Sequence, residues 1–203
     1  MAPKLTEEET DDLLYLARTG ETSELEGDIA TLSAREGVSA AEVLSAARDE
    51  GKSTCLHMAT GNGHLETVRL LLSYFTTSPD LKIPFLDAAN EFGNTALHWA
   101  ALGGHLDTVI LLVEAGAAQG AANQGDYVPL DLALSRGHQA VVDYFFKVSG
   151  MKEGENAAGG ALEGAVEGVE IDGEEASGEE DKAEEKGEGS KAQEKASEEA
   201  KAS

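Results

Sequence analysis

The feature that most constrains this 203-residue chain is a motif that occurs three times within its first 150 residues. The copies are "STCLHMATGNGHLETVRLLL" (53–72), "NTALHWAALGGHLDTVILLV" (94–113) and "YVPLDLALSRGHQAVVDYFF" (127–146). The last two copies are 33 residues apart and the first two are 41 apart, which indicates an insertion of eight residues. Such a period predicts stacked units, because one unit of this size cannot bury its own apolar face.

The motifs "TCLHMATGNGH", "GNTALHWAALGGH" and "VPLDLALSRGH" resemble the ankyrin repeat. This resemblance implies an all-α solenoid in which each unit is a pair of antiparallel helices. Thr54 and Thr95 suit the position before the first helix, where a hydroxyl can bind free backbone N–H groups. Gly63, Gly104 and Gly137 suit the break between the two helices of each unit.

A weaker upstream copy, "LLYLARTGETSELEGDI", raises the prediction to about four helix-pair units, of which the first and last act as caps. We expect a flexible acidic N-terminus over 1–8 and an ankyrin-repeat domain over 9–148. Residues 149–203 lack aromatic residues and consist mostly of Glu, Gly, Ala, Lys and Ser. Because this composition cannot bury enough apolar surface to offset the entropy of ordering, we expect a disordered acidic tail there.

Two insertions lengthen the links between units. Ser39 lies three residues before Glu42, a capping-box pattern that predicts an extra short helix. The second insertion contains Pro79 and Pro84, which favours a non-helical excursion.

The formal net charge of the chain is −24. Such a charge repels nucleic acid and anionic membranes, and it attracts basic partners. The chain has one cysteine, so it can form no intrachain disulfide, which fits a reducing compartment. We find no signal-peptide pattern and no apolar run of the ~20 residues that a membrane span needs. We therefore expect a cytoplasmic monomer that also reaches the nucleus with its binding partner.

Four histidines, His57, His64, His98 and His105, recur at matching positions and raise the question of a metal site. We expect them instead to bind loop backbone between repeats, because no thiolate or carboxylate cluster supports a metal centre. No Ser/His/Asp arrangement and no phosphate-binding loop stands out. The sequence predicts no enzyme, no metal and no cofactor.

The interpretation that remains is a binding surface on the concave face, made by the loop tips and the first helix of each unit. Tyr15, Met58, Trp99 and Leu132 occupy one register position and form an apolar ridge, although Met58 and Leu132 are equally well explained as half-buried packing. Trp99 and Phe92 are the predicted anchors, since large aromatic residues dominate many interfaces. The expected ligand is an amphipathic segment with Lys or Arg at its margins. The candidate partner-binding residues are Tyr15, Glu50, Met58, Glu91, Phe92, Asn94, Trp99, Leu102, Asp126 and Tyr127.

The pairing of "CLHMATGNGHLETVR" with "GNTALHWAALGGHLDTV", the extended link between them and the acidic tail together resemble the Yar-type fungal ankyrin-repeat proteins. That resemblance implies a dedicated chaperone for a newly made basic protein of the small ribosomal subunit, number three, which has a KH domain. It implies that the acidic concave face masks the client's RNA-binding N-terminal segment before 40S assembly.

Two other functions stay open at this point. A generic ankyrin scaffold would bind a signalling or transcription partner, and a histone-type chaperone would also suit an acidic tail. The charge of the partner and the salt dependence of binding distinguish these functions.

Overall fold

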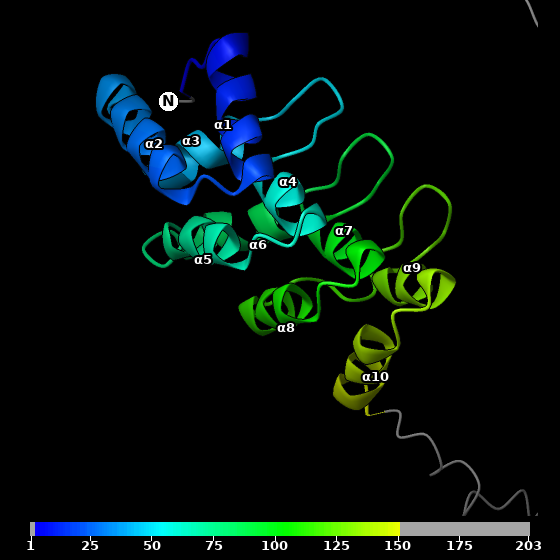
Figure 1. Ribbon diagram of the computed structural model, residues 1–203. Helices are drawn as coiled ribbons and strands as arrows, with labels where there is room; N and C mark the ends of the chain where they lie inside the picture. Colours follow the sequence, from blue (N-terminus) through cyan, green and yellow to red (C-terminus); the bar gives the residue numbers. More distant parts are fainter. Residues whose placement is uncertain (1–2, 151–203) are drawn as a thin grey trace, which may run out of the picture. The chain divides into compact units, whose positions relative to one another are not determined.

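In the computed structural model, residues 3–150 are described, and Figure 1 shows them as a series of short helices joined by loops. This part of the chain contains ten helices and no β-strand. The helices are α1 (Glu7–Thr19), α2 (Thr22–Glu36), α3 (Ala40–Ala46), α4 (Cys55–Gly61), α5 (Leu65–Ser73), α6 (Pro79–Leu86), α7 (Ala96–Gly103), α8 (Leu106–Ala115), α9 (Pro129–Arg136) and α10 (Gln139–Val148). The predicted tail lies outside the described residues except for Ser149 and Gly150.

Eight of these helices form four pairs: α1 with α2, α4 with α5, α7 with α8, and α9 with α10. The first helices of successive pairs contact one another, and the second helices do the same. The predicted all-α solenoid of four helix-pair units is therefore confirmed.

Small and aliphatic side chains at matching positions make one continuous core along the stack. Ala59, Ala100 and Ala133 are completely buried, and a methyl group at this position lets neighbouring first helices approach closely. Leu56 and Leu97, the central residues of the Thr-x-Leu-His motif, are also buried between units. Each unit thus buries its apolar residues against its neighbours, as the repeat period requires.

The first helix begins at Glu7, two residues before the expected start of the ankyrin-repeat domain at residue 9. Thr6 and Glu9 form a capping box, in which the Thr6 N–H donates to Glu9 Oε2 (2.9 Å) and the Glu9 N–H donates to Thr6 Oγ1 (3.2 Å). The Lys4 N–H donates to Glu36 Oε2 on α2 (2.9 Å). Acidic residues in this first turn also suit the positive end of the helix dipole.

Arg35 on α2 connects this first turn to the second helix. Its guanidinium donates to Glu9 and to Glu36, and the hydrogen bond from Arg35 holds the pKa of Glu9 at about 2. Because the Arg35 side chain is 45% exposed, water screens these ion pairs. The contact therefore positions the N-terminal segment and adds little to global stability.

The two insertions both form helices that pack on each other. The capping box of Ser39 and Glu42 is present, and the predicted short helix is α3. The predicted non-helical excursion around Pro79 and Pro84 is wrong, because this segment is α6 and packs against α3. Pro79 occupies the first turn, where its missing N–H costs nothing. Phe85 is buried and stacks on Phe75 with a centroid distance of 4.3 Å, which offsets the hydrogen bond lost at Pro84.

Candidate partner-binding face

Two buried histidines fix the loops on which the candidate residues lie. His98 Nδ1 accepts from the Thr95 N–H (3.1 Å) and the Thr95 hydroxyl (2.9 Å), and its Nε2 donates to the Tyr127 carbonyl (3.0 Å). His57 makes the same contacts with Thr54 and with the carbonyl of Asn94 (2.9 Å). Each ring must be neutral, because Nδ1 accepts while Nε2 donates. The predicted role of these residues in binding loop backbone is confirmed.

A second set of histidines ties each second helix to the preceding unit. His64 Nε2 donates to the Arg18 carbonyl (2.9 Å), and His105 donates to the Gly61 carbonyl (3.2 Å). His138, which the sequence analysis does not single out, donates to the Leu102 carbonyl (3.0 Å). These bonds cap the ends of the first helices and set the spacing between units.

The loops before α7 and α9 share one internal geometry, and the loop before α4 has one of its two bonds, from the Ser53 N–H to Asp49 Oδ1 (2.6 Å). Asn90 Oδ1 accepts from the N–H groups of Phe92 and Asn94, both at 3.0 Å. Asn123 Oδ1 accepts from Gly125 (2.9 Å) and Tyr127 (3.1 Å) in the same way. The sequence signal for this loop geometry is the Asn near the start of the loops before α7 and α9, because an Asn side chain accepts from backbone N–H groups that follow it and so favours such turns.

Backbone hydrogen bonds join the three loops into one row, and Figure 1 shows all three projecting to the same side. The Glu91 N–H donates to the Gly51 carbonyl (2.8 Å), and the Gln124 N–H donates to the Phe92 carbonyl (3.0 Å). The side chain of Asn94 is used in the same connection, since its Oδ1 accepts from Asn123 Nδ2 (2.8 Å). The structure therefore gives Asn94 a scaffolding contact.

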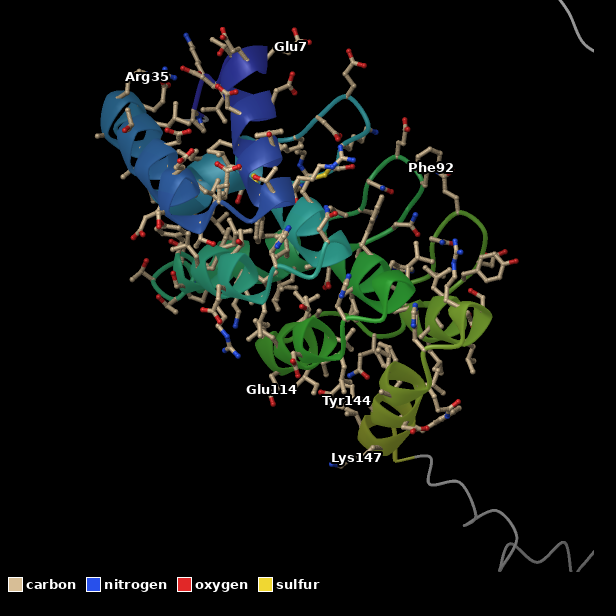
Figure 2. The ribbon with its side chains drawn as sticks, viewed as in Figure 1. Glu7, Arg35, Phe92, Glu114, Tyr144 and Lys147 are labelled. Atoms are coloured by element: carbon tan, nitrogen blue, oxygen red, sulfur yellow. The ribbon has the colours of Figure 1, made fainter. Side chains whose placement is uncertain are left out.

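The tips of these loops combine aromatic rings with carboxylates. Phe92 is 59% exposed and Tyr127 is 55% exposed, while Glu50, Glu91 and Asp126 are also exposed. In Figure 2, Phe92 lies at the tip of the loop that precedes α7. We call the surface made by these five residues the loop-tip row. An exposed Phe surrounded by carboxylates suits a partner that carries both apolar and basic side chains.

The predicted apolar ridge is only partly exposed. Tyr15 is 61% exposed, whereas Met58, Trp99 and Leu132 are half-buried, and so is Leu102. The Trp99 ring covers Gly61 of the preceding unit, and its Nε1 is buried without a hydrogen-bond partner. Trp99 therefore lies in the floor of the face formed by α1, α4, α7 and α9, which we call the first-helix face, while Phe92 projects from the loop-tip row.

The fold also creates an acidic groove that the sequence analysis did not identify. It lies between the start of α1 and the first loop, has a volume of about 810 Å³, and brings Glu7 and Asp11 near Asp49 and Glu50. Arg48 is its one basic lining residue. These carboxylates are distant in sequence, so only the stacking of α1 on α4 brings them together.

Within residues 3–150, no three His, Cys, Asp or Glu side chains come together in a way that could hold a metal ion. None of the helices in this described part of the chain is long and apolar enough to cross a membrane. Cys55 is fully buried, and burial raises the pKa of its thiol to about 12.

Comparison with known proteins shows which families and solved structures this chain resembles. Ankyrin-repeat families match residues 52–82 and, as "Ankyrin repeats (3 copies)", residues 79–153. The "Ankyrin repeat-containing protein YAR1" of Saccharomyces cerevisiae is 37% identical over 94 residues, which is 44% of this chain and 44% of that protein. A chain from the crystal structure of the yeast ribosomal protein Rps3 in complex with its chaperone Yar1 matches with a TM-score of 0.65 and 37% identity, over 71% of this chain and 95% of that chain. This chain belongs to the Yar-type ankyrin-repeat family.

For this Yar-type chain, the sequence match to the curated yeast protein spans less than half of that protein's length. The structural match is broader and covers most of the four stacked units. The repeat expected from the sequence is present, and the structure brings Glu50, Glu91, Phe92, Asp126 and Tyr127 into one row. Tyr15 lies apart from that row on α1, beside a hollow shared with α2.

Proposed function

We propose that this protein is a non-catalytic chaperone of a newly made, basic small-subunit ribosomal protein of the Rps3 kind. The observation that carries the proposal is the loop-tip row, where Phe92 and Tyr127 lie exposed among three carboxylates. The yeast relative Yar1 is described as the chaperone of Rps3, which supports this client over other basic proteins.

The charges suggest how such a chaperone works. A ribosomal protein carries a basic surface that binds RNA phosphates, and in free form it associates with RNA without specificity. We place this basic surface in the N-terminal segment of the client. The carboxylates of the loop-tip row would bind it and speed capture of the client by electrostatic steering. Ribosomal RNA would then release the client by competing for the same surface. We place the capture step in the cytoplasm, where the client is synthesised, and propose that a monomer performs it.

A binding assay with purified components tests this function. The protein should bind purified Rps3 at low salt, should lose it as the salt concentration rises, and should prevent Rps3 from aggregating on RNA. Core histones serve as the competing basic client. If histones bind more tightly than Rps3, or if an uncharged partner is the one retained from a cell extract, the proposed function is wrong.

Replacing Phe92 with Ala should weaken Rps3 binding by about thirtyfold, because an interface anchor of this size contributes ~2 kcal/mol. The thermal unfolding temperature should stay within about 1 °C of the original, since surface substitutions rarely change stability. Ile83→Ala is the matched control, because Ile83 is 47% exposed on α6, away from the loop-tip row. Equal losses of affinity in the two variants would exclude Phe92 as an anchor.

A further inference from the structure

The first-helix face contains a small hollow between α1, α4 and α7. Its volume is about 210 Å³, and its lining residues are Arg18, His57, Met58, Gly61, Asn62 and Trp99. Pockets that bind small molecules usually measure about 300–1,000 Å³. This hollow is therefore of a size for one protein side chain.

The hollow exists because position 61 has no side chain. A Cβ added at Gly61 would lie 2.8 Å from Trp99 Cε3, which is too close for two carbon atoms. The matching position is Leu102 in the third unit and Ser135 in the fourth. Gly61 thus allows the Trp99 ring to lie flat across the unit boundary, where it forms one wall of the hollow beside Met58.

The polar groups of the hollow differ from the rest of this acidic surface. Arg18 is exposed at its edge, and its guanidinium forms no ion pair with any residue in the described part of the chain. The Trp99 N–H has no acceptor, so packing alone holds the ring. Arg18 is the one charged residue among those lining the hollow, the Trp99 N–H is buried from solvent, and no carboxylate lines the hollow. Its chemistry thus complements an apolar side chain that has an acceptor group next to it.

We propose that this hollow is a specificity pocket for the client, and that it receives one apolar side chain of the bound segment while a carboxylate of that segment pairs with Arg18. The proposal rests on the proposed function and deepens it. A segment that only carries positive charge would bind the loop-tip row but would meet Arg18 with like charge. Selection therefore needs an apolar residue and an acidic residue in the middle of the segment, and basic residues toward the loop-tip row.

The test uses the full chain and synthetic peptides that cover the N-terminal segment of yeast Rps3, with each peptide position changed in turn to Lys and to Ala. Gly61→Ser closes the hollow, because a side chain at this position pushes against the Trp99 ring. Arg18→Glu reverses the charge at its edge. Each substitution should lower the affinity for the original peptide about tenfold, since both remove interactions at the centre of the interface.

The decisive result is a charge-reversal rescue. One acidic peptide residue should exist whose change to Lys weakens binding to the original protein about tenfold and restores binding to the Arg18→Glu variant. Thermal unfolding of both variants is measured in parallel, and Arg69→Glu on α5, another exposed cation, is the control. If the original protein binds Rps3 but no peptide position shows this rescue, the pocket proposal is wrong and the proposed function stands. If the original protein does not bind Rps3, both are wrong.

Discussion

Reversing all three carboxylates of the loop-tip row, in the variant Glu50→Lys, Glu91→Lys and Asp126→Lys, should lower the affinity for Rps3 by about a hundredfold or more at ~0.1 M salt. The exposed carboxylates would then be replaced by like charges facing a basic client, and electrostatic steering would oppose association. The fold should tolerate the change. Asp126 has a positive φ of 60°, and Lys52 already adopts a φ of 62° at the matching position of the first loop.

The control for this variant carries the same change in net charge elsewhere. Glu66, Asp107 and Glu114 are exposed on α5 and α8, and their replacement by Lys should lower the affinity by about threefold at most, through long-range charge alone. Figure 2 shows Glu114 on α8, apart from the labelled Phe92. If the two triple variants lose equal affinity, net charge and not the loop-tip row determines client binding.

Replacing His98 with Ala should lower the free energy of unfolding by about 3 kcal/mol. Each buried polar group that is left without a hydrogen-bond partner costs ~1–3 kcal/mol of stability. The affected groups are the Thr95 N–H, the Thr95 hydroxyl and the Tyr127 carbonyl. His105→Ala is the matched control and should cost about 1 kcal/mol, since it removes one bond at a half-buried site. Urea unfolding of the three proteins measures both values. Equal losses would show that His98 is not the stronger connection.

The two buried histidines, His57 and His98, predict how the stability of the fold depends on pH. Burial lowers the pKa of both His57 and His98, so protons bind more readily to the unfolded chain than to the folded one. Their contribution to stability should be complete above the ordinary histidine pKa of about 6.5 and should fall as the pH drops below it, by at most ~1.4 kcal/mol per pH unit for each residue. The decline between about pH 6.5 and pH 5 should be shallower in His98→Ala. An unchanged slope in that variant would mean that His98 does not titrate as its burial predicts.

Local motifs were sufficient to predict the repeated part of the fold. The Thr-x-Leu-His and Gly-His motifs recur in register, and each predicts contacts within one unit or between neighbouring units. The hydrogen bonds of His57 and His98 confirm these contacts. The helix α6 could not be predicted in this way. Pro79 and Pro84 disfavour a helix locally, and the stacking of Phe85 on Phe75 that outweighs them is a tertiary contact.

The candidate site was predictable to a similar degree. Phe92 and Tyr127 are aromatic residues at loop positions where the other repeats have small or polar residues, and both are exposed. The hollow beside Trp99 was not predictable, because it depends on the meeting of Gly61 with a ring from the next unit. The ridge position correctly marked Trp99 as unusual, but only the stacking geometry shows that its indole lies in the floor of the face.

The most direct test of the chaperone function is a calorimetric titration of purified full-length protein with Rps3 at two salt concentrations. We expect one-to-one binding that weakens by at least about thirtyfold between ~0.1 M and ~0.5 M salt, as charge complementarity at an exposed acidic surface requires. No heat of binding at low salt, or an affinity that is the same at both salt concentrations, would contradict the account.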